Sequence, residues 1–205
     1  MSEKYIFIDT GKVKIESALF VPKGQVKGAV VICHPHPLYG GDMHNNVVVG
    51  LQNSLEERSF ATLRYNFRGV GESGGLEGDL PGDIEDLQKI IVYLKDIEIL
   101  QEVPFTVMGY SYGTIVALTT GSNASALVAV APPVTLFDMN FLPKISKPLL
   151  VIVGSHDPFC PKEKIRKLLP SHAEFELIVG ADHFFIGAEF RVGTLVGDFL
   201  EKIFS

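Results

Sequence analysis

Gly109-Tyr110-Ser111-Tyr112-Gly113 is a Gly-x-Ser-x-Gly pentapeptide that lies between an apolar run, residues 105–108, and a helix-like run, residues 114–120. A serine on such a tight strand-to-helix turn adopts a strained backbone conformation, and its hydroxyl is pushed out above the sheet. Small neighbours are needed, because a Cβ at either glycine would collide with the adjacent strand or helix. This position between a strand and a helix makes Ser111 a candidate nucleophile.

Strand and helix patterns alternate along the rest of the chain. Short apolar runs rich in β-branched residues predict strands, and apolar residues at helical spacing predict helices. The predicted strands are residues 4–9, 12–20, 28–33, 62–67, 105–108, 126–131, 148–153 and 174–179, and the predicted helices are residues 46–58, 83–97, 114–120, 161–169 and 187–203. A turn at Thr10-Gly11 makes the first two strands a hairpin. This order predicts an α/β fold with a doubly wound, mostly parallel sheet and an antiparallel hairpin at its N-terminal edge.

Length and composition are typical of one globular domain, which we assign to residues 1–205. The hydrophobic fraction is 46 % and the charged fraction 20 %, which is ordinary for a soluble protein. A net charge of -6 without a Lys/Arg run argues against a nucleic-acid partner, and no apolar stretch approaches the ~20 residues that span a bilayer. The N-terminus lacks the apolar core of a signal peptide, and two cysteines make no disulfide framework. We therefore expect a cytoplasmic protein with no membrane partner, and the oligomeric state stays open.

Two later loops hold an acid and a base that could activate Ser111. Reactive groups of open parallel sheets gather at the carboxyl ends of the strands, and the expected chain order is serine, acid, histidine. Asp157 follows the strand predicted at residues 148–153, and His183 follows the strand predicted at residues 174–179. We predict that His183 takes the proton of Ser111 and that Asp157 orients and stabilises His183.

Each of these assignments has an alternative. Asp157 could merely cap the helix that begins near Pro161, and Asp138, after the preceding strand, would then be the substitute acid. Asp182 is adjacent to the histidine in sequence, but we assign it a structural role because it would point elsewhere. His156 is interpreted as a loop residue rather than as the base.

Four stretches of the chain resemble the α/β-hydrolase family. They are the pentapeptide, Gly154-Ser155-His156-Asp157, Ala181-Asp182-His183-Phe184, and Asn66-Phe67-Arg68-Gly69-Val70-Gly71-Glu72-Ser73. The resemblance covers Gly28 to the C-terminus, and it is closest to small dienelactone-hydrolase-like and serine-esterase members, to which residues 33–41 also point. It implies an α/β-hydrolase fold with Ser111, Asp157 and His183 as the triad, in agreement with the positional argument.

An oxyanion hole needs two backbone N–H groups that point at the developing negative charge. The residue after the nucleophile, Tyr112, should supply one. The other should come from the loop after the strand at residues 28–33, where Pro35 and Pro37 have no N–H, which leaves His36 or Leu38. The resemblance implies His36, because the family's His-Gly-x-Pro loop aligns with residues 34–37, although this chain has proline where glycine is usual.

Two other patterns invite a ligand. His34, His36, Asp42 and His44 could suggest a metal, but the spacing is looser than the metallo-hydrolase pattern and the prolines restrict the turn, so we predict no metal. The glycine-rich residues 69–75 lack the Lys-Ser/Thr of a phosphate cradle and are interpreted as a structural turn.

The chemistry predicted by these motifs is the hydrolysis of small carboxylic esters through an acyl-enzyme, with no cofactor. Only residues 132–147 separate two neighbouring strands, which leaves no room for a large cap. The predicted apolar wall of the open pocket consists of Leu38, Tyr39, Tyr110, Phe141, Phe159 and Phe184. Short-acyl or small aromatic esters are the expected partners. An acyltransferase, a thioesterase, a peptidase and a non-catalytic ligand-binding protein remain alternatives.

Overall fold

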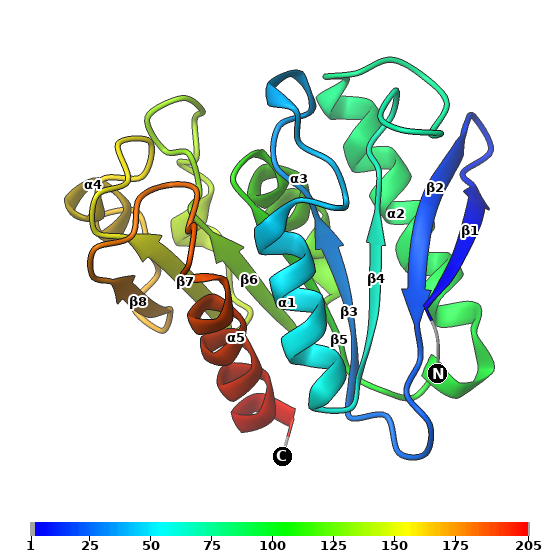
Figure 1. The fold of residues 1–205 in the computed structure, drawn as a ribbon. Coiled ribbons are helices and arrows are strands. Elements are labelled where there is room, and N and C mark those ends of the chain that lie inside the picture. Colours follow the sequence, from blue (N-terminus) through cyan, green and yellow to red (C-terminus); the bar gives the residue numbers. More distant parts are fainter. Residues whose placement is uncertain (1–2, 205) are drawn as a thin grey trace.

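The computed structural model describes residues 3–204, whose strands form one eight-stranded sheet in the order β1-β2-β4-β3-β5-β6-β7-β8 (Figure 1). The strands are β1 (Lys4–Asp9), β2 (Lys14–Phe20), β3 (Gly28–Cys33), β4 (Phe60–Tyr65), β5 (Phe105–Tyr110), β6 (Ala126–Val130), β7 (Leu149–Gly154) and β8 (Glu174–Ile178). The α-helices are α1 (Asn46–Glu57), α2 (Leu80–Asp96), α3 (Tyr112–Thr120), α4 (Lys162–Arg166) and α5 (Glu189–Phe204), and the 3-10 helices are η1 (Pro37–Tyr39), η2 (Glu98–Leu100), η3 (Gly121–Asn123) and η4 (Leu142–Lys144). Only the pairs β1–β2 and β2–β4 are antiparallel. This confirms the predicted α/β fold with its N-terminal hairpin.

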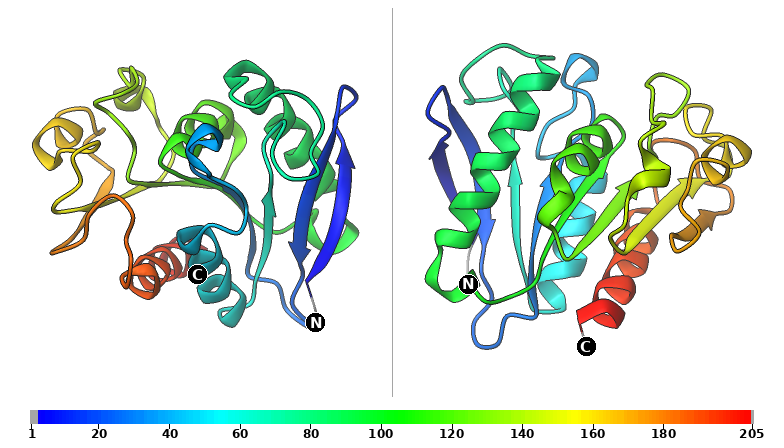
Figure 2. Two further views of the ribbon diagram at one scale, coloured as in Figure 1. Left: turned by 45° about the horizontal axis from the view of Figure 1, so that its top comes forward. Right: turned by 180° about the vertical axis from the view of Figure 1, so that it is seen from behind.

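Helices cover both faces of the sheet. Figure 1 and Figure 2 show α1 and α5 on one face, and α2 and α3 on the other. Successive residues of a strand point to opposite faces, so Val31 of β3 packs in the core with Leu87 of α2, and the next residue, Ile32, packs with Leu51 of α1. Coverage on both sides explains why the central strands read as continuous apolar runs.

The strand predicted at residues 62–67 is shifted in the structure, where β4 begins two residues earlier. Phe60 already pairs with Gly28 of β3. The N–H of Phe67 donates to Nε2 of His34 instead of to a neighbouring strand, so the ladder has ended before this residue. The prediction was wrong at this end because Phe67 continues the alternation of apolar and polar residues beyond the point where the backbone leaves the sheet.

Two helices also differ in length from the prediction. α2 begins at Leu80 rather than at residue 83, because Asp79 accepts a hydrogen bond from the N–H of Gly82 and Pro81 fits the first turn. α4 spans only Lys162–Arg166 instead of residues 161–169. Within residues 3–204, no helix has the length and hydropathy that a bilayer crossing requires.

Candidate active site

Ser111 lies on the sharp turn between β5 and α3, where φ is 53° and ψ is -121°. A residue other than glycine rarely adopts a positive φ, so the surrounding hydrogen bonds must hold this conformation. The N–H of Ser111 donates to the carbonyl of Val130, and its own carbonyl accepts from both the N–H and the hydroxyl of Thr114. β6 on one side and the first turn of α3 on the other therefore fix the serine in its strained geometry.

The two glycines of the pentapeptide allow this turn to be so tight. A Cβ on Gly109 would lie 2.1 Å from the carbonyl oxygen of Gly113, and a Cβ on Gly113 would lie 2.4 Å from the carbonyl oxygen of Cys33. The predicted collisions with the adjacent helix and strand are therefore confirmed. The absence of a Cβ on Gly113 also lets the start of α3 pack closely against the end of β3.

The structure brings the three predicted catalytic residues into mutual contact. Nε2 of His183 lies 2.9 Å from Oγ of Ser111, and Nδ1 of His183 lies 2.8 Å from Oδ2 of Asp157. The side chains come from the loops after β5, β7 and β8. Ser111, His183 and Asp157 are 9 %, 7 % and 5 % exposed, so little water competes for these hydrogen bonds. The geometry is that of a hydroxyl that a neighbouring imidazole can deprotonate.

Asp157 is anchored from its own loop. Its Oδ1 accepts hydrogen bonds from the N–H groups of Phe159 and Cys160, which leaves Oδ2 directed at the histidine. The cap residue of α4 is Pro161, so this carboxylate does not cap that helix. Asp138 is exposed, and its carboxylate accepts from the N–H of Asn140 in its own turn.

We predict a large difference between two aspartate variants. Asp157→Asn should lower kcat for ester hydrolysis by roughly 10³–10⁴-fold, because an amide in this position favours the wrong tautomer of His183. Asp138→Asn removes the same charge from the alternative acid and should change kcat by less than about twofold. Steady-state kinetics of both variants test the assignment, and it is contradicted if the effects are reversed.

Tyr110 has a role that the sequence did not indicate. Its hydroxyl donates to the backbone carbonyl of His183 at 2.9 Å, within the buried interior. The last residue of β5 is thus bonded to the loop that carries the base. Tyr110 also lines the pocket beside Ser111, as predicted from sequence.

The geometry favours His36 over Leu38 as the second N–H donor of the predicted oxyanion hole. The N–H of Leu38 donates to Nδ1 of His36 at 3.3 Å. The N–H of His36 has no acceptor within residues 3–204, and His36 lines the same pocket as Ser111 and Tyr112. Tyr112 is the first residue of α3, where an N–H has no partner inside the helix. Both predicted donors are therefore available beside the serine.

The residues considered for a metal site are used in other ways. His34 is buried, and its two ring nitrogens contact the N–H of Phe67 and the carbonyl of Pro35. Asp42 accepts from the N–H of His44, whose ring contacts Arg64. In the part of the chain that the structure describes, no three His, Cys, Asp or Glu residues could hold a metal ion together.

His34 should make the fold sensitive to acid. Nε2 accepts from Phe67, so Nδ1 carries the proton, and burial lowers the pKa of His34 to about 3. The unfolded chain binds a proton near pH 6.5, so stability is lost as pH falls from about 6.5 towards 3. Between pH 7.5 and 4.5, the unfolding free energy of the wild type should fall by about 3 kcal/mol more than that of His34→Gln, as measured by urea denaturation.

Asp83 has the opposite effect on the unfolding free energy over the same pH range. The comparison between the wild type and His34→Gln cancels this effect. Burial raises the pKa of Asp83 to about 6, so the folded state takes up this proton first and gains stability as the pH falls. Asp83 is present in both proteins. Equal losses in the wild type and in His34→Gln would contradict the prediction for His34.

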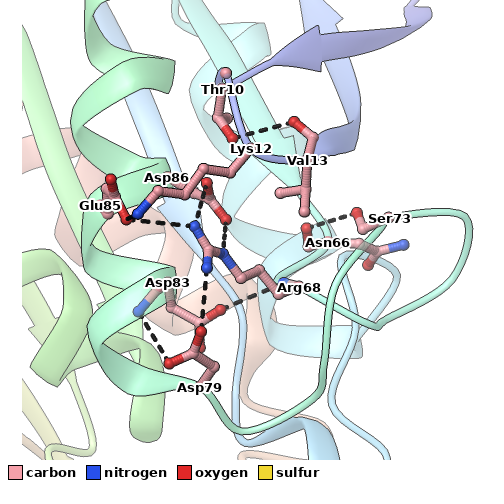
Figure 3. A network of polar contacts seen from close by, with 12 residues as sticks. Thr10, Lys12, Val13, Asn66, Arg68, Ser73, Asp79, Asp83, Glu85 and Asp86 are labelled. Atoms are coloured by element: carbon pink, nitrogen blue, oxygen red, sulfur yellow. Dashed lines mark hydrogen bonds and ion pairs between the residues drawn. The ribbon is translucent and has the colours of Figure 1, made fainter.

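An ion-pair network joins the glycine-rich turn to the first part of α2 (Figure 3). The guanidinium of Arg68 donates to both carboxylate oxygens of Asp86 and to Asp79. Asp83 accepts from the N–H of Arg68 and from the hydroxyl of Tyr112. The glycine-rich turn is thus joined to α2, and α2 in turn to the residue that follows Ser111.

A pocket of about 510 Å³ opens at the triad. Four of the six predicted wall residues line it, namely Tyr39, Tyr110, Phe159 and Phe184. Tyr39 is 87 % exposed and Phe184 55 %, so the mouth is open to solvent. Between β6 and β7, the described chain contains only the short helix η4, which leaves the pocket without a cap.

Leu38 and Phe141 lie outside the pocket, and this corrects the sequence prediction. Leu38 turns away in η1 and lies beside Gly78, whereas Phe141 packs against the buried cluster under α2 and α3. Their places are taken by Leu136, Phe137 and the side chain of Tyr112. Aromatic residues in the connection after β6 were the available signal, but it did not tell which of them faces the pocket.

Comparisons with known proteins agree with this fold. Residues 24–141, more than half of the chain, match the family model described as serine aminopeptidase, S33. The chain is similar to the structure of an alpha-beta serine hydrolase homologue from Coxiella burnetii, with 30 % identity, a TM-score of 0.88 and 97 % of each chain covered.

Two more distant structures share the fold. XC6422 from Xanthomonas campestris, described as a member of the α/β serine hydrolases without lid, is 22 % identical, with a TM-score of 0.87 and coverage of 98 % of this chain and 95 % of that chain. Est1E from Butyrivibrio proteoclasticus, solved with ferulic acid bound, is 19 % identical, with a TM-score of 0.85 and coverage of 96 % of this chain and 98 % of that chain.

Proposed function

The chain belongs to the α/β-hydrolase family, and from this premise we propose that it is a serine hydrolase that cleaves small carboxylic esters through an acyl-enzyme. The observation that carries the proposal is the chain of contacts from Ser111 through His183 to Asp157, at 2.9 Å and 2.8 Å, at the base of an apolar pocket. The proposed reaction uses these side chains, two backbone N–H donors and water.

The first half of the reaction forms the acyl-enzyme. Oγ of Ser111 attacks the ester carbonyl while Nε2 of His183 takes its proton. The carbonyl oxygen becomes an oxyanion that accepts hydrogen bonds from the N–H groups of Tyr112 and His36. When the tetrahedral intermediate collapses, the C–O bond to the alcohol breaks, and His183 returns the proton to the leaving oxygen.

Water completes the cycle. His183 removes a proton from a water molecule, whose oxygen attacks the acyl carbon, and the bond to Ser111 breaks as the serine recovers its proton. The acid is released and the enzyme is regenerated. Asp157 orients His183 throughout the cycle, because it accepts two backbone hydrogen bonds in its own loop and one from the histidine.

The direct test is the turnover of p-nitrophenyl acetate and butyrate. We expect steady-state release of p-nitrophenol with both esters, because the mouth of the pocket is uncapped and its wall is apolar. The Ser111→Ala variant is the control for release without the enzyme's nucleophile. Wild-type turnover no faster than that control with either ester would refute the esterase proposal, and lasting transfer of the acyl group to an added alcohol or thiol would favour an acyltransferase.

We further propose that residues 1–205 act as one cytoplasmic domain. Both cysteines, Cys33 and Cys160, are buried free thiols, as expected of a chain that works in a reducing compartment. Burial also raises the pKa of Cys160, so this thiol stays protonated beside Asp157 and does not compete with Ser111 as a nucleophile.

A further inference from the structure

The lining of the pocket at Ser111 is uncharged in the part of the chain that the structure describes. Within residues 3–204, its lining includes no Asp, Glu, Lys or Arg. Its titratable groups are three tyrosines and two histidines, one of which is His183 itself. Partial burial lowers the pKa of the other, His36, which favours its neutral form. An occupant of this pocket therefore meets no ion-pair partner.

The polar ends of the inner tyrosines are already used by the protein. The hydroxyl of Tyr110 donates to the carbonyl of His183, and the hydroxyl of Tyr112 donates to Asp83. Their rings remain as wall, together with Phe137, Phe159 and Phe184. Burial of an apolar or aromatic group of the substrate against this wall makes the free energy of binding more favourable.

Carboxylates near the pocket are occupied by other groups. Asp157 accepts two N–H groups and the base. Asp182 is exposed, and it accepts from the N–H of Phe184. Glu189 accepts from the side-chain amide of Asn46. None of the three lines the pocket in the described chain, so none is placed to form a direct ion pair with a cation bound there.

Two helix N-termini lie at the same pocket. α1 begins directly after Asn45, and α3 begins directly after Ser111, and both of these residues line the cavity. The positive ends of both helix dipoles favour the oxyanion and oppose a positive charge. Aromatic faces do attract cations, but this attraction is weaker than the hydration that an ammonium group loses when it is buried without a carboxylate.

We propose that the site takes an uncharged, apolar acyl group and rejects an acyl group that carries a free α-ammonium. The chain would then not be an aminopeptidase, although its family model carries that description, because an aminopeptidase must bind the ammonium of the residue it releases. This inference rests on the proposed function and narrows its substrate class.

The test compares two esters that differ by one group. Methyl 3-phenylpropanoate and phenylalanine methyl ester share a skeleton, but only the second carries an α-amino group. At a pH below the pKa of that amine, we expect kcat/KM to be at least about 10²-fold higher for the phenylpropanoate. Above that pKa the ratio should shrink by about tenfold or more, and any titration of His183 cancels because both esters depend on it equally.

The outcomes separate this inference from the proposed function. A ratio within threefold at the lower pH, with both esters hydrolysed, would overturn the inference and leave the hydrolase assignment standing. A preference for the phenylalanine ester would do the same. If neither methyl ester is hydrolysed while the p-nitrophenyl esters are, the inference is overturned and the hydrolase assignment stands. If none of these esters is hydrolysed, both are overturned.

A pair of variants tests the electrostatic cause. Asn45→Asp places a carboxylate in the lining and keeps the cap, because Asn45 accepts the hydrogen bond from the N–H of Val47 through an oxygen that aspartate also has. Asn53→Asp adds the same charge to the exposed side of α1, eight residues or about 12 Å along the helix. Asn45→Asp should shift the ratio of the two kcat/KM values at least fivefold towards the ammonium ester, and Asn53→Asp should shift it less than twofold. An equal shift in both variants would show that the charge of the pocket lining is not the cause of the selectivity.

Discussion

Ser111→Ala is expected to reduce kcat for ester hydrolysis by roughly 10⁵-fold and to abolish labelling by a fluorophosphonate. The loss is large because no other hydroxyl can take over the position. Ser111 is held at a φ of 53° by β6 and α3 and lies 2.9 Å from the imidazole of His183. Alanine removes the attacking oxygen but keeps the Cβ, so the elbow itself should persist.

The fold of this variant must be checked alongside its activity. The unfolding midpoint of Ser111→Ala should lie within a few degrees of the wild type, because the substitution removes one hydroxyl that is 9 % exposed. Labelling that survives in a folded Ser111→Ala protein would show that the nucleophile is a different residue.

His183→Ala is the second large expected effect, with a loss in kcat of at least 10³-fold and roughly as great as that of Ser111→Ala. Without the imidazole, the hydroxyl keeps its own high pKa and the leaving alcohol receives no proton. Activity that remains should also lose whatever pH dependence the imidazole gives to the wild-type rate. Steady-state rates from pH 5 to 9 measure both effects.

His156→Ala is the matched control for this prediction. His156 lies in the neighbouring loop next to Asp157, but its side chain is exposed, and its backbone N–H donates to the carbonyl of Ala181. We expect kcat to change by less than about twofold. A large loss in His156→Ala together with a small loss in His183→Ala would exchange the two assignments.

The three triad residues could be predicted from the sequence because each lies in a recognisable motif directly after a strand. The pentapeptide around Ser111 and the loops with Asp157 and His183 each follow a predictable strand, and parallel strands end at one edge of the sheet. Topology alone therefore brings these loops together. The contact of Tyr110 with the base loop could not be predicted, because it depends on a hydroxyl that reaches a backbone carbonyl 73 residues away.

Side-chain direction in the loops was the harder part. Leu38 and Tyr39 are neighbours, yet η1 turns one beside Gly78 and the other into the rim of the pocket. Phe137 and Phe141 lie in one connection, and only the first lines the pocket. Composition predicts that such loops supply an aromatic wall, but packing against the finished core decides which residues form it.

The short connection between β6 and β7 has a consequence for engineering. Leu136 and Phe137 line the pocket, and exposed Asp138 and Asn140 follow at once. Residues grafted beside Asp138 would begin next to the pocket lining, while Met139 between the two polar positions keeps its place in the buried core. In the described chain, this connection makes no hydrogen bond with Ser111, Asp157 or His183. The scaffold thus offers an attachment point at which a designed gate could select substrates by size, leaving the machinery beneath it untouched.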